Sequence, residues 1–283
     1  AMIQVNNVFH DYEGKGNCAV SDISFTVEGG SIFGFLGPSG AGKSTIQNIM
    51  TGLLPLQRGE VLYDGASVRG LKTRFFNQIG VSFEQSNLYS SLTGLENLRY
   101  YAALFSVPTI KPMELLERVG LREDANKRVS NYSKGMKQRL TFARALINSP
   151  KYLFLDEPTG GLDPKTAVGI RELINEQKQR GAAVFLTTHS MDLADALSDT
   201  VAFLYGGVIA ACDTPEALKL KYGKRDVRVR YNENGEEKER TFAMDDKAAL
   251  SAFLTTADVV KLHSQEATLE EIFLLVTGKE LTA

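Results

Sequence analysis

A glycine-rich stretch near the N-terminus constrains the fold of this chain more than any other feature. It matches the pattern G-x-x-x-x-G-K-[ST] of a phosphate-binding loop. Ser31–Leu36 before it is typical of a short buried strand, and Ile46–Met50 after it is typical of the start of a helix. A chance glycine turn is the alternative, and these flanks argue against it. The loop consists of Gly37, Pro38, Ser39, Gly40, Ala41, Gly42, Lys43, Ser44 and Thr45.

The chemistry of phosphate binding explains why such a loop needs these residue types. Glycines leave backbone N–H groups free to approach phosphate oxygens, because no side chain blocks the way. The helix that follows points the positive end of its dipole at the same place. We therefore expect Lys43 to reach the β- and γ-phosphates of a nucleotide and Ser44 to hold Mg²⁺.

Composition and charge narrow the classes of protein to which the chain can belong. Its 283 residues allow one large or two small domains. A net charge of −2 and an isoelectric point of about 6.0 give no global basic field, so nucleic acid is not expected as a partner. Cys18 and Cys212 form no framework spacing, which favours a reducing cytoplasm. The sequence has no signal pattern and no apolar run of the ~18 residues that cross a bilayer, so we expect any membrane role to act through a partner.

The middle of the chain differs from the strands that flank it in the spacing of its apolar residues. Residues 2–36 are expected to form antiparallel-type strands, and further strands are expected at 59–65 and 79–83. Residues from about 88 to 150 instead carry helical spacing, which predicts a helical subdomain inserted into an α/β domain. The expected helices of this subdomain are 93–105, 112–119 and 137–147.

Two acidic residues follow a continuous apolar run at 151–155, which is typical of a central parallel strand. Asp156 and Glu157 would then lie at the edge of the sheet where α/β proteins bind ligands. Asp156 can act on Mg²⁺ and Glu157 can act as a base that polarises water, whereas two solvated turn acids are the alternative. His189 ends the strand predicted at 182–186 and its Thr-Thr extension. A lone His is more often structural, but parallel pairing would bring this one to the same edge.

Three further positions gain interest only from their surroundings. Tyr12 lies just before the first turn, where a half-buried aromatic residue at a strand end is the simpler interpretation. Gln85 follows the strand at 79–83 and would by itself be a solvated loop residue. Ser133 and Gly135 precede a helix, so they form either a second anion site or an ordinary helix cap.

The C-terminal part of the chain is a separate unit by composition. A hairpin at 201–212 and a helix opening at 214–216 precede a shift near Gly223. Two alternating segments joined by residues 232–236 then predict a second hairpin. We expect domains at 1–222 and 223–283, the second a small α/β appendage without a chemical motif. Support of a dimer, partner docking and structural capping all remain open for it.

Taken together, these motifs resemble those of the ATP-binding cassette (ABC) ATPases. The resemblance covers roughly residues 2–220, and the motifs occur in the family's order from the phosphate loop to His189. It implies an α/β fold with a P-loop NTPase core, an antiparallel β-subdomain and the inserted helical subdomain, followed by the appendage. It also implies ATP hydrolysis, with ATP and Mg²⁺ as cofactors.

The resemblance assigns roles within one copy of the chain. Tyr12 would stack on adenine, and residues 37–45 would bind the phosphates. Gln85 would touch Mg²⁺ or the attacking water. Asp156 would bind Mg²⁺ through water, Glu157 would be the general base, and His189 would contact the γ-phosphate.

Other roles implied by the resemblance involve a second copy. Ser133 and Gly135 would contact the γ-phosphate of a nucleotide bound to the other copy, and Asp163 would lie at the seam. The two copies would close head to tail over two ATP molecules and open after hydrolysis. The family's signature is usually Leu-Ser-Gly-Gly-Gln, and here it is residues 132–136. Tyr132 replaces the Leu, Lys134 replaces the first Gly and Met136 replaces the Gln.

Three stretches resemble one branch of the family in particular. They are similar to stand-alone ATPase subunits of bacterial multidrug, antibiotic or sodium exporters, whose membrane domains are separate chains. The implied partner is an integral membrane permease, and the implied location is cytoplasmic, peripheral on the inner face of the cell membrane. The stretches are Tyr132–Gln138, Pro158–Pro164 and Leu269–Gly278.

Two other functions compete with transport. A soluble ABC ATPase acting on nucleic acid or the ribosome usually carries two cassettes or long basic insertions, and this chain has neither. A regulatory module that senses ATP without turnover would not need Glu157 and His189, which are both present.

Overall fold

Two units make up the chain in the computed structural model, which describes residues 1–16, 18–223, 226–233, 235–265 and 267–278. The first unit comprises residues 1–212, and the second begins at Asp213. The division therefore comes ahead of the boundary expected after residue 222. Helix α7 (Pro215–Tyr222) groups with the second unit because it packs against helix α9 (Leu269–Thr277).

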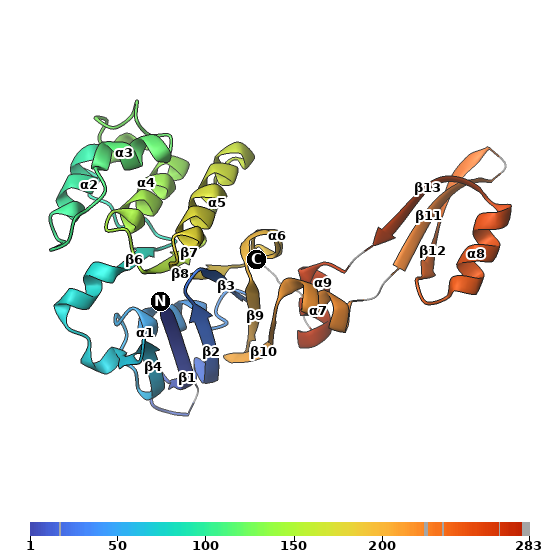
Figure 1. The fold of residues 1–283 in the computed structure, drawn as a ribbon, viewed down its shortest axis with the longest axis horizontal. Coiled ribbons are helices and arrows are strands. Elements are labelled where there is room, and N and C mark those ends of the chain that lie inside the picture. The colour runs from blue at the N-terminus through green and yellow to red at the C-terminus, as the bar shows by residue number, and fades with distance from the viewer. Residues whose placement is uncertain (17, 224–225, 234, 266, 279–283) are drawn as a thin grey trace. The chain divides into compact units, whose positions relative to one another are not determined.

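A six-stranded sheet in the order β10-β9-β3-β8-β7-β6 forms the centre of the first unit (Figure 1). Strand β3 pairs in parallel with β8 and β9, so the expectation that all strands within 2–36 are antiparallel is wrong for its last strand. The strands leave their carboxyl ends at one edge because β6, β7, β8 and β3 all run the same way. Their bounds are β3 (Ser31–Leu36), β6 (Ile79–Ser82), β7 (Tyr152–Asp156), β8 (Ala183–Thr188), β9 (Thr200–Tyr205) and β10 (Val208–Asp213).

Alternation along the central strands buries both faces of this sheet. In β7, Leu153 and Leu155 contribute to the core beneath the helical layer, whereas Tyr152 and Phe154 contribute to the core on the opposite face. Such two-sided burial explains why residues 152–155 are all aliphatic or aromatic. The sheet is thus packed on both faces, and this packing holds the strand ends that carry the polar edge residues.

A second, antiparallel sheet in the order β2-β1-β4-β5 covers one face of the first unit. Helix α1 (Lys43–Met50) packs its apolar side into the core that the two sheets share. Phe25 of β2 and Phe33 of β3 bridge the sheets, with stacked rings 4.8 Å apart at their centroids. The strands are β1 (Met2–His10), β2 (Val20–Glu28), β4 (Arg58–Tyr63) and β5 (Ala66–Ser67).

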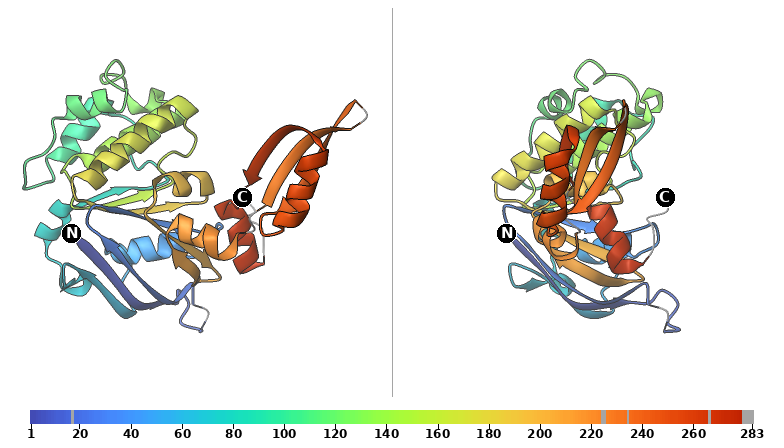
Figure 2. Two further views of the ribbon diagram at one scale, coloured as in Figure 1. Left: turned by 45° about the vertical axis from the view of Figure 1, so that its right-hand side comes forward. Right: turned by 90° about the vertical axis from the view of Figure 1, so that its right-hand side faces the viewer.

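Helices cover the other face of the central sheet, as Figures 1 and 2 show for α2 to α5. The helical subdomain lies between β6 and β7 in the chain, as the sequence predicts. Its third helix begins at Lys134, three residues before the predicted start, because the Ser133 hydroxyl accepts a hydrogen bond from the Met136 N–H and caps it. The helices are α2 (Gly94–Ala102), α3 (Pro112–Arg118), α4 (Lys134–Leu146), α5 (Pro164–Gln179) and α6 (Met191–Leu197).

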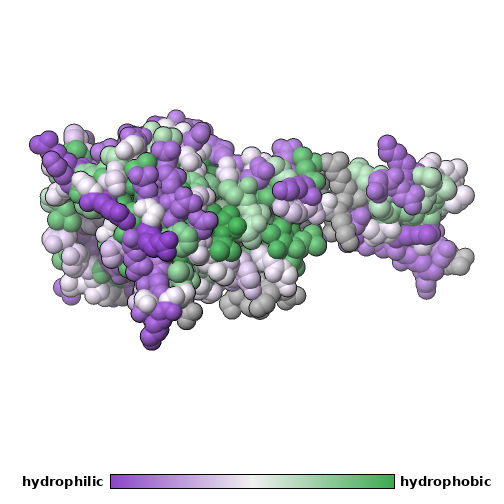
Figure 3. All heavy atoms as spheres, turned by 90° about the horizontal axis from the view of Figure 1, so that it is seen from below, coloured by the Kyte–Doolittle hydropathy of each residue, from purple (hydrophilic) through white to green (hydrophobic). Residues whose placement is uncertain are grey.

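The second unit contains a three-stranded antiparallel sheet and helix α8 (Lys247–Thr256). Val227, Val229 and Phe242 form its small core, against which Phe253 of α8 packs. Helices α7 and α9 pack together, and Figure 3 shows hydrophobic residues gathered over them. The strands follow the order β12-β11-β13 and are β11 (Asp226–Glu233), β12 (Glu236–Ala243) and β13 (Asp258–Gln265).

Candidate active site

The phosphate loop connects the end of β3 to the start of α1, as predicted. Two of its glycines leave space that any other residue would fill. A Cβ at Gly37 would lie 2.3 Å from the Leu204 carbonyl oxygen, and one at Gly42 would lie 2.8 Å from the Ala19 carbonyl oxygen. Gly42 also has a φ of 111°, which L-residues rarely adopt. The sequence motif is therefore required by the close packing of this loop against its neighbours.

The Lys43 ammonium lies within the phosphate loop itself. Its Nζ donates to the carbonyl oxygens of Gly37 at 2.5 Å and Pro38 at 3.0 Å. Burial lowers the pKa of Lys43, and the negative charges of Glu157, Asp156 and Glu84 oppose that shift. The cation thus faces three carboxylates across the edge of the sheet, where it can neutralise an anionic ligand.

Asp156 lies at the end of β7, beside the end of β8. The two strands are in register at Asp156 and Thr187, and the Thr187 hydroxyl donates to Asp156 Oδ1 at 2.6 Å. Burial raises the pKa of Asp156, and the nearby charges of Glu157 and Glu84 raise it further. Its second oxygen is the one that can accept an additional ligand.

Glu157 is the most tightly held of the predicted catalytic residues. It is only 9% exposed and adopts a φ of 46°, in the left-handed region that non-glycine residues rarely occupy. Thr188 Oγ1 donates to Glu157 Oε2 at 2.8 Å, while the His189 N–H donates to Oε1 at 2.7 Å. His189 Nδ1 lies 2.6 Å from the same Oε1. The structure therefore brings Glu157 and His189 into direct contact at the edge where the sequence places them.

Three supporting side chains were not predicted as site residues. Thr187 and Thr188 orient the carboxylates of Asp156 and Glu157. Their position directly before His189 is the feature of the sequence that could have indicated this role. Gln138 of α4 donates to the Glu157 carbonyl oxygen at 3.1 Å and is buried. Gln138 ends the stretch Tyr132–Gln138 that resembles the exporter branch, but that pattern does not indicate its partner, which is 19 residues away on another element.

Tyr12 and Gln85 lie at the surface near the phosphate loop and the sheet edge, respectively. The Tyr12 hydroxyl is 3.1 Å from Thr45 Oγ1, although the side chain is 62% exposed. Gln85 is exposed three residues after β6, whose end adjoins that of β7. The half-buried interpretation of Tyr12 is therefore wrong, because the aromatic ring projects into solvent.

Ser133, Gly135 and Asp163 form a second group. A Cβ at Gly135 would lie 3.4 Å from the Leu162 side chain and 3.7 Å from the Gly161 carbonyl oxygen, so the signature contacts the loop that leads to Asp163. Asp163 caps α5 by accepting bonds from the Thr166 N–H and hydroxyl, which lower its pKa. Among the described residues, no hydrogen bond joins Ser133 or Gly135 to the phosphate loop. Among the residues that the structure describes, this group therefore has no hydrogen-bonded link to Lys43.

The residues predicted to hold Mg²⁺ offer oxygen donors of the kind that this ion prefers. They are the exposed Ser44 hydroxyl, the Asp156 carboxylate and the Gln85 amide oxygen. Within the described ranges, no three His, Cys, Asp or Glu side chains gather closely enough to hold a metal by themselves. This donor set fits an ion that shares its coordination with a phosphate ligand and water.

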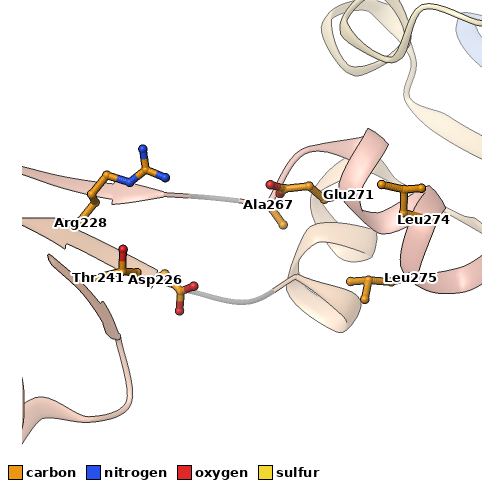
Figure 4. Close-up of a pocket in the computed structure, with 7 residues that line it drawn as sticks. All are labelled: Asp226, Arg228, Thr241, Ala267, Glu271, Leu274 and Leu275. Carbon is orange, nitrogen blue, oxygen red and sulfur yellow. The ribbon is translucent and has the colours of Figure 1, made fainter. Parts of the chain in front are cut away.

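A pocket of about 500 Å³ lies in the second unit, apart from these residues. Its polar lining includes Arg228 and Thr241 from the strands, and its apolar lining includes Leu274 and Leu275 from α9 (Figure 4). None of the predicted site residues lines it. In the part of the chain that the structure describes, no helix is both long and apolar enough to span a bilayer.

A phosphate loop on a parallel sheet, flanked by an antiparallel sheet and a helical subdomain, defines the class of ATP-binding cassettes. Solved structures support this class. An ATP-binding subunit of an ABC transporter matches with a TM-score of 0.71 and 27% identity, covering 79% of this chain and 94% of that one. An ATP-binding cassette solved as a dimer in a post-hydrolysis state with ADP and phosphate matches with a TM-score of 0.69 and 28% identity, covering 75% and 98%.

Sequence relatives place the chain more narrowly. The ABC transporter family profile matches residues 20–160. A fluoroquinolone export ATP-binding protein of Mycobacterium tuberculosis is 46% identical over 99% of this chain and 95% of its own length. The Nod factor export ATP-binding protein I of Rhizobium johnstonii is 36% identical over 99% and 96%. The chain belongs to the ABC transporter family and is an ATP-binding, ATP-hydrolysing subunit of such a transporter.

Proposed function

We propose that two copies of this chain close head to tail over two ATP molecules and thereby drive export through a separate membrane permease. The observation that carries this proposal is that the signature and the phosphate loop are not bonded to each other within one chain. Lys43 interacts with Asp156 and Glu157 at the sheet edge, whereas the exposed Ser133 has no hydrogen bond to the phosphate loop among the residues that the structure describes. A second copy would supply the signature that each ATP site lacks.

Within one copy, each residue at the sheet edge has a distinct chemical task. Lys43 neutralises the β- and γ-phosphates, which requires it to exchange its carbonyl partners for phosphate oxygens. Glu157 accepts a proton from the attacking water, and His189 holds that carboxylate while facing the γ-phosphate. Tyr12 presents its exposed ring to the adenine base, and the loop residues 39–45 donate backbone N–H groups to the phosphates.

Mg²⁺ would be held by Ser44, Asp156 and Gln85. When bound, it would neutralise the charge that develops on the phosphate oxygens during phosphoryl transfer. Asp156 suits this task because its own burial leaves the carboxylate short of compensating positive charge. Ser133 and Gly135 would complete the site from the other copy, with the N-terminus of α4 aimed at the γ-phosphate, and Asp163 would lie at the seam.

An integral membrane permease is the second proposed partner. Two relatives carry export in their names, one for fluoroquinolones and one for Nod factor, which supports export as the direction. Tyr89 and Tyr100 are about half exposed and pack edge to face at the start of the helical subdomain, close in sequence to Gln85. We propose that this surface docks the permease, so that Gln85 reports the nucleotide state, and that the subunit lies on the inner face of the cell membrane.

ATP-driven association tests the proposed closure. Glu157→Gln removes the base while keeping a side chain of the same shape, so hydrolysis should slow and closed dimers should accumulate with Mg²⁺ and ATP. Static light scattering of this variant and of the wild type, each with and without EDTA, measures the outcome. A Glu157→Gln chain that stays monomeric at saturating ATP would contradict closure by ATP alone.

A further inference from the structure

The loop that presents Tyr12 is unusually well anchored for an exposed segment. Tyr12 lies two residues beyond the end of β1, and its side chain is 62% exposed. An aromatic ring gains most from stacking on a base when it is already held in place, because ordering it on binding costs affinity. The contacts that hold the loop therefore bear on nucleotide recognition.

Gln57 fixes the backbone immediately before Tyr12. Its Oε1 accepts from the Asp11 N–H at 2.8 Å, and its Nε2 donates to the Asp11 carbonyl oxygen at 2.9 Å. One side chain thus satisfies both backbone polar groups of a residue 46 positions away. Gln57 is itself held, since the Arg69 guanidinium donates to the carbonyl oxygens of Leu56 and Gln57.

The Asp11 carboxylate fixes the backbone immediately after Tyr12. Oδ1 accepts from the N–H groups of Glu13 at 2.9 Å and Gly14 at 3.0 Å, and Oδ2 accepts from the Gly16 N–H at 2.6 Å. These bonds, that from Gly16 foremost, lower the pKa of Asp11 below its ordinary 3.8. Tyr12 is therefore clamped on both sides in the chain.

The Tyr12 ring is held separately by two side chains. His10 is 3% exposed and meets the ring edge to face, with centroids 4.7 Å apart. The Tyr12 hydroxyl lies 3.1 Å from Thr45 Oγ1 in the phosphate loop. This second contact links the base platform to the phosphate loop, so any displacement of the clamp would also displace the ring from its position above that loop.

We propose that Asp11 and Gln57 are positioning residues for nucleotide binding, which preorganise Tyr12 as the platform for the base. The inference rests on the proposed role of Tyr12 as that platform. Neither side chain touches the nucleotide in this proposal. Their effect is expected mainly on ligands that carry a base, because the hydrogen bonds given above for Asp11 and Gln57 go to the Tyr12 loop and not to the phosphate loop.

Calorimetric titration of the full chain with two ligands tests this proposal. MgADP carries the base, whereas inorganic tripolyphosphate with Mg²⁺ contains only phosphates. Tyr12→Ala should weaken MgADP binding by about 5- to 150-fold, the range expected for loss of one base–aromatic stack. Asp11→Ala and Gln57→Met should each weaken it by about 3- to 10-fold, and all three should leave the tripolyphosphate affinity within about twofold of the wild type.

A double variant separates positioning from general support of the fold. In the Tyr12→Ala background, Asp11→Ala should cost no further affinity for MgADP, because residues that act through one ring are not additive. Glu13→Ala is the matched control, since Glu13 belongs to the same loop and its side chain pairs with exposed Lys15. It should bind both ligands as the wild type does.

Each outcome has a distinct meaning. If Tyr12→Ala weakens both ligands equally or neither, the proposed role of Tyr12 fails. If Tyr12→Ala is selective for MgADP but the Asp11 and Gln57 variants bind MgADP normally, the positioning role is wrong. Parallel loss of both ligands in those variants, or additive losses in the double variant, would overturn it as well.

Discussion

The sheet edge that carries Asp156 and Glu157, called the catalytic edge below, is held in place differently from the signature at residues 132–136. Glu157 at the edge is nearly buried and receives bonds from the Thr188 hydroxyl and the His189 N–H. Ser133 in the signature is exposed, and its hydroxyl accepts a bond from its own helix at Met136. One group is preorganised by its own chain, whereas the other presents a capped helix end to the outside. Under the closure proposed above, this difference would mean that each chain carries one half of each of two sites.

Preorganisation suits Glu157 if, as proposed, its carboxylate accepts a proton from the attacking water. A carboxylate that is already oriented needs no rearrangement during the reaction. The signature instead must be free to engage and release, since its contacts would exist only in the closed state. The Leu162 side chain and Gly161 carbonyl beside Gly135 connect the two regions through the loop after Glu157. Along the chain, only residues 158–162 separate Glu157 from Asp163, and this loop adjoins the signature at Gly135.

Complementation between two inactive variants should give the largest effect. Glu157→Gln removes the base, and Gly135→Asp places a carboxylate where the partner's γ-phosphate would bind. Gly135 has room for a Cβ, and an acid is favourable at a helix N-terminus, so this variant should fold. Mixed before ATP is added, the two should recover up to roughly a quarter of wild-type ATPase activity, because half of randomly formed dimers would contain one intact site out of two.

The measurement is phosphate release by each variant alone and by mixtures of varied ratio. Gly135→Ala is the control, since it adds only a Cβ, for which there is room, without a charge and should retain most activity. If the signature acted within its own chain, every chain in the mixture would still carry a defect. If the activity of the mixture equals the sum of the activities of the separate variants, the signature does not act on the site of a second copy.

Thr188→Val should have the next largest effect. The variant keeps the shape of the side chain but removes the hydroxyl that donates to Glu157 Oε2, so the base loses one of its orienting bonds. We expect kcat to fall about tenfold with little change in KM, the size expected for one hydrogen bond to a charged group. Steady-state kinetics with Thr188→Ser as control measures this. Wild-type kcat in the Val variant would show that the edge is not held by this bond.

The sequence predicts some parts of this site and not others, for reasons of distance along the chain. The phosphate loop and the Asp156-Glu157 pair are contiguous, so the pattern carries the geometry with it. The bond from Gln138 to the Glu157 carbonyl joins separate elements, so the stretch that contains Gln138 does not reveal the partner of its side chain. Likewise, β3 continues the antiparallel pattern of β1 and β2 in the sequence, yet it pairs with strands more than 140 residues away.

The Asp156 carboxylate should reveal a stability cost at the catalytic edge. Its pKa in the folded chain lies above the ordinary 3.8, so ionisation destabilises the nucleotide-free fold at neutral pH. That cost is complete above the folded pKa and disappears as pH falls through it towards 3.8. Asp156→Asn should raise Tm at pH 7 by about 2–4 °C, corresponding to roughly 1 kcal/mol in a chain of this size.

Thermal denaturation in EDTA, followed by circular dichroism between about pH 4 and pH 7, measures this difference. The gain from Asp156→Asn should shrink steadily towards the acid end. Asparagine keeps an oxygen to accept from Thr187, so the comparison isolates the charge. A variant that is less stable than the wild type at pH 7 would show that the carboxylate contributes stability to the edge instead.

Met136→Gln should have the smallest effect, although it restores the residue usual at this position of the signature. Met136 packs its partly buried side chain against the core of the helical subdomain, while its backbone N–H donates to Ser133. Glutamine would place an amide against that apolar surface and cost about 1 kcal/mol in the free energy of unfolding. The Ser133 cap uses only the backbone, so the ATPase rate should change by less than about twofold. Urea denaturation and phosphate release measure the two quantities. A rate increase of an order of magnitude would instead show that the signature side chain at position 136 reaches the nucleotide, and that packing alone does not account for the methionine.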